Sequence, residues 1–134
     1  MPVYVDASAL VALHVEGASR LSVEEHLLAD REWCTSAITL AEALALVDRV
    51  VDEPADRSEL EDLIRLTWDR IAVVPVDARC LDLAGRLLRA QPLRLSDAIH
   101  LAAADRLGHP LTFLTLDPAQ IPVALSLGFD VVPG

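Results

Sequence analysis

Residues 2–10 have the sequence PVYVDASAL, in which a short apolar segment stops at Asp6 and a helical segment starts at Ala7. β-Branched and aromatic residues favour strands, and an acidic residue directly before a helix is a preferred N-cap. This stretch therefore predicts a strand over 2–5 and a helix over 7–14. Because the strand is apolar on both faces, other elements must cover it on both sides.

The same alternation of strand and helix continues along the chain. Further apolar segments predict strands at 33–36, 73–76, 111–115 and 130–132. Helical periodicity predicts helices at 18–30, 38–51, 56–70, 78–90, 95–107 and 118–127. Asp77 is expected to be the N-cap of the helix at 78–90, and Gly108 and Gly128 are expected to end the last two helices. Short, uniformly apolar strands that alternate with helices are typical of a parallel sheet covered on both faces. We expect an α/β fold, a three-layer α/β/α sandwich, formed by a single domain over residues 1–134.

The composition indicates a large core and an acidic surface. Hydrophobic residues make up 53% of the 134 residues and aromatic residues only 4%, so the core is mainly aliphatic. The net charge is −10, which argues against capture of nucleic acid by a basic patch. An RNA substrate would need bound divalent cations or a basic partner chain to offset this charge.

The cysteines and the N-terminal segment exclude several classes of protein. Cys34 and Cys80 fit no zinc-binding spacing, and we expect two buried, reduced thiols rather than a disulfide. A signal peptide is not expected, because the segment lacks a basic leader and includes Asp6. No apolar run reaches the ~18 residues of a membrane span. These features predict a cytoplasmic protein without a membrane partner.

Four of the 21 acidic residues lie in apolar surroundings: Asp6, Glu42, Asp97 and Asp117. Burial of an unpaired carboxylate costs several kcal/mol, so each of them needs a partner or a cation.

Each of the four, taken singly, has a structural interpretation. Asp6 could cap the helix that starts at Ala7, and Glu42 has capping-box spacing after Thr39. Asp97 lies in a first helical turn, where the helix dipole favours an anion. Asp117 is followed by a proline, as an N-cap often is.

Together, the four carboxylates favour a metal site. Asp6 and Asp117 follow the carboxyl ends of strands, where ligands bind in open α/β sheets, and Glu42 and Asp97 lie in the first turns of helices that face the same edge. Converging carboxylates repel one another unless a cation lies between them. Hard oxygen ligands without Cys or His favour Mg²⁺ or Mn²⁺, and the matching chemistry is phosphoryl transfer by metal-activated water.

These residues also carry a family resemblance. The sequence resembles PIN domains, and most of all the VapC toxins of bacterial toxin–antitoxin pairs, over nearly its whole length. The segments that carry the resemblance, in order, are VDASAL at 5–10, TS at 35–36 with LAE at 40–42, LSDAIHLA at 95–102 and TLD at 115–117.

The resemblance implies a five-stranded parallel sheet, Mg²⁺ or Mn²⁺ as cofactor, and endonucleolytic RNA cleavage that leaves a 5′-phosphate. It places Asp6, Glu42, Asp97 and Asp117 in the acidic, metal-binding site. Ser8 and Thr115 match hydroxyl positions with a secondary role, in which they orient a carboxylate or a metal-bound water. The implied partners are a small antitoxin with an Arg-bearing tail and a second copy of the chain. The chain departs from the family pattern at two places: Ala7 stands where Thr or Ser is frequent, and residues 118–120 follow Asp117 where a basic residue is common.

Two further residues lie close to the acidic set in sequence. His100 follows Asp97 by three residues; we expect a hydrogen-bonded structural histidine rather than a general base, because metal-activated water needs no such base. Arg94 could contact a phosphate or remain an ordinary surface residue.

Three other functions compete with a nuclease. A phosphoacceptor domain relies on a lysine, and this chain has none. A haloacid-dehalogenase-type phosphatase would have a second Asp at the position of Ser8. The stronger alternative is a catalytically silent PIN-like domain that binds RNA or protein.

Overall fold

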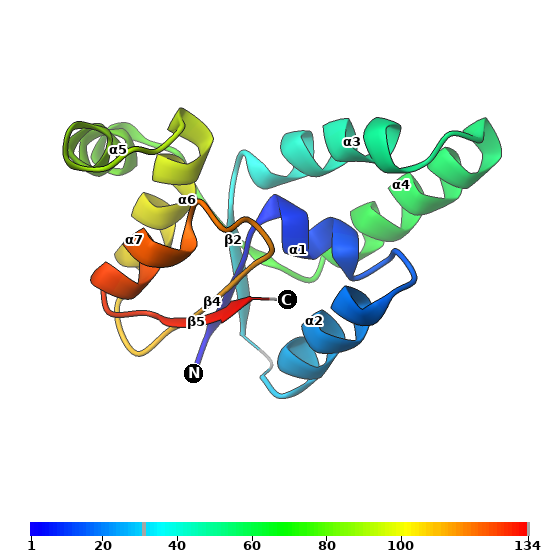
Figure 1. The fold of residues 1–134 in the computed structure, drawn as a ribbon, viewed down its shortest axis with the longest axis horizontal. Coiled ribbons are helices and arrows are strands. Elements are labelled where there is room, and N and C mark those ends of the chain that lie inside the picture. Colours follow the sequence, from blue (N-terminus) through cyan, green and yellow to red (C-terminus); the bar gives the residue numbers. More distant parts are fainter. Residues whose placement is uncertain (31, 134) are drawn as a thin grey trace.

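The computed structural model describes residues 1–30 and 32–133, which form five parallel strands covered by helices (Figure 1). The strands are β1 Val3–Val5, β2 Trp33–Ser36, β3 Ala72–Val74, β4 Thr112–Thr115 and β5 Asp130–Pro133. Each strand is short and rich in apolar or β-branched residues, and all four neighbouring pairs are parallel. The predicted five-stranded parallel sheet is confirmed.

The order of the strands places the start of the chain at the centre of the sheet. The order is β3-β2-β1-β4-β5, so the chain runs outward from β1 in one direction and returns to the other side of β1 with β4. The direction of winding therefore reverses between β1 and β4. In open α/β sheets, the crevice at the carboxyl ends of such a pair of strands is the usual ligand site.

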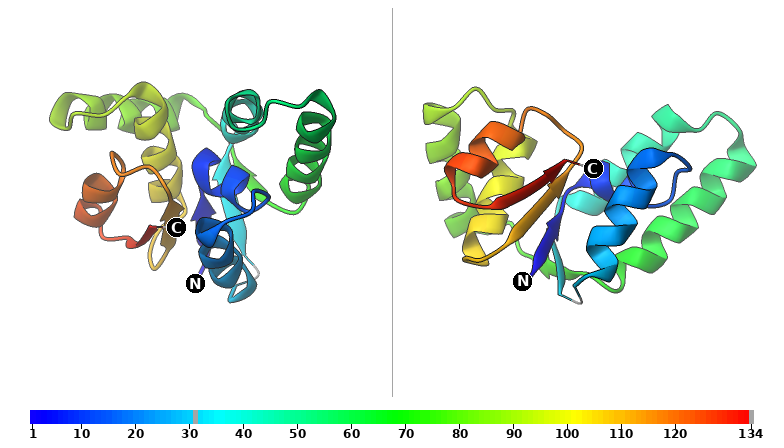
Figure 2. Two further views of the ribbon diagram at one scale, coloured as in Figure 1. Left: turned by 45° about the vertical axis from the view of Figure 1, so that its right-hand side comes forward. Right: turned by 60° about the horizontal axis from the view of Figure 1, so that its bottom comes forward.

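Helices cover both faces of the sheet, as the views of Figures 1 and 2 show. On one face lie α1 Ala7–Ala12, α2 Ala18–Leu28, α3 Thr39–Val50 and α4 Pro54–Trp68. On the other lie α5 Ala78–Ala90, α6 Leu95–Arg106 and α7 Ile121–Ser126. The three-layer α/β/α sandwich is confirmed.

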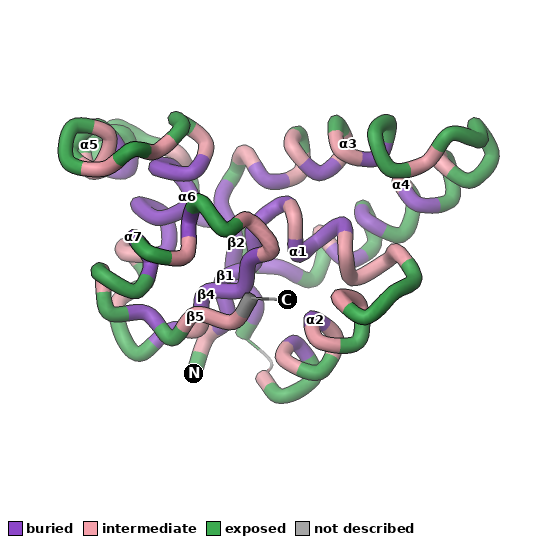
Figure 3. The backbone as a smooth tube through the Cα atoms, viewed as in Figure 1, coloured by how far each residue is buried: buried purple, intermediate pink, exposed green. Residues whose placement is uncertain are grey.

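The sheet divides the core into two apolar clusters (Figure 3). All of β1 is buried, and so is β4 after Thr112. The cluster under α1 to α4 is aliphatic and includes Leu10 and Ile64. The cluster under α5 to α7 contains stacked aromatic rings: Tyr4 lies 5.2 Å from Phe113, centroid to centroid, and Phe113 lies 6.0 Å from Phe129. The rigid centre of the sheet therefore lies beneath the β1/β4 crevice.

Several predicted helix ends agree with the structure. Asp6 caps α1 and Asp77 caps α5, each by accepting a hydrogen bond from a backbone N–H three residues later. Gly108 and Gly128 follow α6 and α7 with φ of 80° and 86°, a conformation that glycine adopts without strain.

One predicted helix start and one capping alternative are wrong. Asp117 does not cap a helix that starts at Pro118, because α7 begins only at Ile121. Glu42 is not part of a capping box: the N-cap of α3 is Ile38, without a side-chain cap, and Glu42 contacts another helix instead.

Cys34 and Cys80 are free and buried, as expected. Among the described residues, no helix has the length and apolar character required to span a membrane.

Candidate active site

A cleft of about 490 Å³ opens at the carboxyl ends of β1 and β4. All four predicted acidic residues line it: Asp6 after β1, Glu42 on α3, Asp97 on α6 and Asp117 after β4. The topology thus brings together carboxylates that lie up to 111 positions apart (117 − 6) in the sequence.

Asp6 is buried, with 2% of its surface exposed, the same fraction as Asp97. Its Oδ1 accepts hydrogen bonds from Ser8 Oγ at 2.7 Å and from the backbone N–H of Ala9 at 2.9 Å. Its Oδ2 accepts from Thr115 Oγ1 at 2.5 Å and from Gln120 Nε2 at 2.9 Å. Four donors therefore fix the carboxylate in one orientation.

Burial raises the pKa of Asp6 above its usual value, because it removes water from the charged carboxylate. Attraction to His100 and the hydrogen bond from Thr115 offset only part of this cost. A cation next to Asp6 would supply the missing stabilisation of the charged form.

Ser8 and Thr115 have a second function besides contacting Asp6. The same Ser8 Oγ accepts a hydrogen bond from the Leu116 backbone N–H at 2.9 Å, and Thr115 Oγ1 accepts one from the Asp117 N–H at 2.9 Å. Each hydroxyl therefore connects Asp6 to the chain segment that carries Asp117. The two hydroxyls fix the position of the segment after β4 relative to the end of β1.

Asp97 and Asp117 share one cation, the guanidinium of Arg94. Arg94 Nε lies 3.1 Å from Asp97 Oδ2, and Arg94 Nη2 lies 3.3 Å from Asp97 Oδ1 and 2.7 Å from Asp117 Oδ2. The Asp97 side chain is 3% exposed, whereas that of Arg94 is 71% exposed. The position of Arg94, just before α6, places its side chain across the mouth of the cleft.

Glu42 is held by a chain of hydrogen bonds from the opposite side of the sheet. His100 Nε2 lies 2.5 Å from Glu42 Oε1, and the Tyr4 hydroxyl lies 2.7 Å from His100 Nδ1. Because burial raises the pKa of Tyr4, its hydroxyl keeps its proton and donates to Nδ1, which leaves Nε2–H to donate to Glu42. The expectation that His100 is a hydrogen-bonded histidine is confirmed.

Sequence reasoning missed the contact that Gln120 makes with Asp6. The residue is 2% exposed, and its Oε1 is buried without a hydrogen-bond partner among the described residues. It lies in the segment 118–120, where the sequence departs from the family pattern, and this departure was the only available signal.

Sequence reasoning also missed that Arg94 joins Asp97 to Asp117, although the sequence carried a signal for its contact with Asp97. Arg94 precedes Asp97 by three residues, a spacing at which side chains on one helix end meet. Its second contact, to Asp117, depends on the order of the strands.

The donor set fits a hard divalent cation. Its ligands would all be carboxylate oxygens, and the guanidinium of Arg94 already occupies a cation position between Asp97 and Asp117. With the side chains as they stand, no three His, Cys, Asp or Glu residues in the described ranges are arranged to hold one ion. Asp6, Glu42, Asp97 and Asp117 are the residues that would hold the ion.

Comparison with known proteins identifies the family of the chain. A family model described as PIN domain matches residues 3–124. The chain is 38% identical to Ribonuclease VapC46 of Mycobacterium tuberculosis over 132 residues, which cover 97% of this chain and 95% of the relative.

Solved structures show the same fold. The structure of VapC20 from Mycobacterium tuberculosis, described as a toxin that cleaves the sarcin–ricin loop, matches with a TM-score of 0.72 and 22% identity over 98% of each chain. The DNA-bound VapBC complex of Salmonella typhimurium matches with a TM-score of 0.72 and 15% identity, again over 98% of each chain. The family model and the relative both extend over most of the sequence, and the chain belongs to the PIN domain family.

Proposed function

We propose that this chain is a metal-dependent endoribonuclease and the toxin of a type II toxin–antitoxin pair. The observation that carries the proposal is the convergence of Asp6, Glu42, Asp97 and Asp117 on one cleft at the β1/β4 crevice. The similarity to a protein named as a VapC ribonuclease supports the same activity.

In this proposal, the four carboxylates hold Mg²⁺ or Mn²⁺, which supplies an activated water and neutralises charge on the scissile phosphate. The other residues of the site position these carboxylates. Ser8, Thr115 and Gln120 orient Asp6, and His100 holds Glu42. The buried Tyr4 fixes the His100 ring in turn.

We further propose that the partner is a small antitoxin that inserts an Arg side chain into this acidic cleft, and that the chain forms a homodimer. A net charge of −10 suits a basic partner, since Arg binds carboxylates through two parallel hydrogen bonds. Several of the solved structures with this fold are VapBC complexes. A light-scattering mass equal to that of the monomer would contradict the dimer.

The test is cleavage of RNA by the purified chain, freed of any partner, with Mg²⁺, Mn²⁺ or a chelator. We expect discrete fragments that require the metal and disappear in Asp97→Asn. Asp105→Asn is the matched control, because Asp105 lies on the same helix but does not line the cleft. It should cleave like the unchanged protein.

Two outcomes would overturn the proposal. If the folded protein cuts none of several RNAs with either metal, while it still binds RNA or a partner, the chain is a binding module. If cleavage survives both the chelator and Asp97→Asn, the four carboxylates are not the active site.

A further inference from the structure

We propose that Arg94 is an internal cation that occupies the acidic site in the metal-free protein and leaves it when a divalent cation binds. Once released, the same guanidinium binds a phosphate of the RNA substrate. This inference rests on the proposed metal-dependent ribonuclease function and adds a residue that couples metal binding to substrate binding.

Arg94 contacts both carboxylate oxygens of Asp97. Both carboxylate oxygens of Asp97 accept from the guanidinium, and Oδ2 also faces the Arg94 backbone N–H at 3.4 Å. The shortest contact of the guanidinium, at 2.7 Å, is to Oδ2 of Asp117. A single side chain thus neutralises two of the carboxylates that line the cleft.

A metal ion and the guanidinium cannot occupy this position together. An ion such as Mg²⁺ needs its oxygen ligands at about 2.1 Å, so it must lie against the same oxygens that Arg94 now contacts. Two cations at that separation repel each other strongly.

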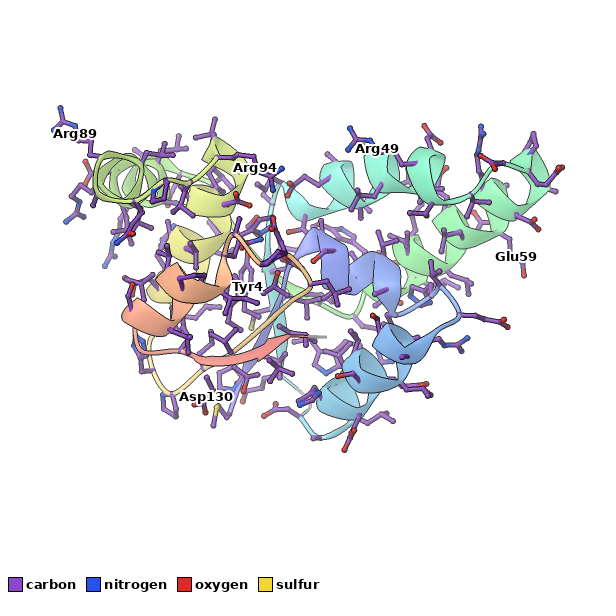
Figure 4. The ribbon with its side chains drawn as sticks, in the orientation of Figure 1. Tyr4, Arg49, Glu59, Arg89, Arg94 and Asp130 are labelled. Atoms are coloured by element: carbon purple, nitrogen blue, oxygen red, sulfur yellow. The ribbon has the colours of Figure 1, made fainter. Side chains whose placement is uncertain are left out.

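The exposure of the Arg94 side chain allows it to change position. Its side chain is 71% exposed, whereas that of Asp97 is 3% exposed, so the arginine can leave into solvent while the carboxylate stays in place. Its backbone is anchored as the N-cap residue of α6, which keeps the released guanidinium at the mouth of the cleft. Figure 4 shows the side chain reaching from this helix end toward α3. An RNA phosphate at the metal would lie within reach of it, and Arg is well suited to bind phosphate.

Arg49 provides a matched control. It lines the same cleft from α3, but within residues 1–30 and 32–133 it forms no ion pair with a carboxylate. Arg49→Gln therefore removes one positive charge from the cleft without opening the Asp97–Asp117 bridge. Arg94→Gln removes both the charge and the bridge.

The first experiment measures Mn²⁺ binding to the metal-free, partner-free protein by titration calorimetry or electron paramagnetic resonance. If Arg94 occupies the site about nine-tenths of the time, its removal should tighten Mn²⁺ binding roughly tenfold. Arg49→Gln should change the affinity by less than about threefold, because it alters only the screened charge. An affinity of Arg94→Gln equal to or weaker than that of Arg49→Gln would overturn the proposal.

The second experiment separates a switch from a structural role. At saturating Mn²⁺, Arg94→Gln should raise KM for RNA and leave kcat within about twofold, so that metal binding tightens while substrate binding weakens. A variant that was merely damaged would lose both. Arg94→Lys keeps the charge but cannot contact a carboxylate through two parallel hydrogen bonds. Its Mn²⁺ affinity and its KM for RNA should lie between those of the unchanged protein and of Arg94→Gln, and it replaces Arg94→Gln if that variant fails to fold.

The two proposals fail in different ways. Suppose that the unchanged protein binds Mn²⁺, that Asp97→Asn abolishes this binding, and that Arg94→Gln leaves the affinity unchanged. Only the role of Arg94 is then refuted. If neither the unchanged protein nor Arg94→Gln binds Mn²⁺, the metal-dependent nuclease is refuted as well.

Discussion

Replacing Thr115 by valine tests how the two ends of the acidic cleft are joined. The residue is fully buried, and its hydroxyl donates to Asp6 Oδ2 at 2.5 Å while it accepts from the Asp117 backbone N–H at 2.9 Å. Valine has nearly the same shape, so the substitution removes these two hydrogen bonds and leaves the packing of β4 intact.

The structure gives the size of the expected loss. A hydrogen bond to a charged group contributes about 1.5–3 kcal/mol to stability, and one between neutral groups about 0.5–1.5 kcal/mol. Thr115→Val should therefore lower the free energy of unfolding by roughly 2–4 kcal/mol. This is a large share of the ~5–15 kcal/mol that a domain has in total.

The assay is equilibrium unfolding in urea, followed by circular dichroism in the presence of a chelator. A lower midpoint with an unchanged slope reports a loss of stability alone. Thr115→Ser is the matched control, since it keeps the hydroxyl and loses one methyl group, worth about 1 kcal/mol. If Thr115→Val proves as stable as Thr115→Ser, the hydroxyl does not connect Asp6 to Asp117 as described.

Three further substitutions test other contacts by the same unfolding assay. Tyr4→Phe keeps the stacked ring but removes the donor to His100 Nδ1, and should cost about 1–3 kcal/mol; a loss below ~0.5 kcal/mol would mean that this nitrogen has another partner. Burial lowers the pKa of His14 below 6.5, so the unfolded chain takes up a proton more readily than the folded one. The free energy of unfolding should therefore fall as the pH drops from about 7.5 through 6.5 toward the lower pKa of His14 in the folded state, and His14→Gln should weaken this pH dependence. If the free energy of unfolding changes with pH equally in both proteins, the lowered pKa of His14 is refuted. Gly128→Ala places a side chain at φ 86° and should cost about 1–2 kcal/mol, whereas a neutral effect would contradict the left-handed turn after α7.

Local patterns in the sequence were sufficient to predict the layers of the fold. The central strands β1 and β4 are short and largely buried on both faces, and the sequence pattern of such a strand does not depend on its neighbours. The caps at Asp6 and Asp77 were predictable for the same reason, since a cap contacts its own helix only three residues away.

The contacts inside the site could not be predicted in the same way. His100 reaches Glu42 across 58 positions, and Gln120 reaches Asp6 across 114. No periodicity connects residues so far apart; only the strand order does. Asp117 shows how this context overrides a local signal: its Oδ1 accepts from the Ala119 N–H in a turn, while its Oδ2 binds Arg94, and α7 starts later than the Asp-Pro pair suggested.

The central position of β1 affects when the protein becomes active during synthesis. Val5 of β1 pairs with Leu114 of β4, so the first strand must wait for 109 further residues (114 − 5) before it acquires that neighbour. At typical rates of translation, this delay is roughly 5–20 s. For most of that time, the growing chain on the ribosome contains Asp6 but neither Asp97 nor Asp117. A chain whose translation stops before Asp97 never contains either of them. With the active site that we propose, the chain cannot cut RNA before Asp117 has been synthesised and β4 has paired with β1.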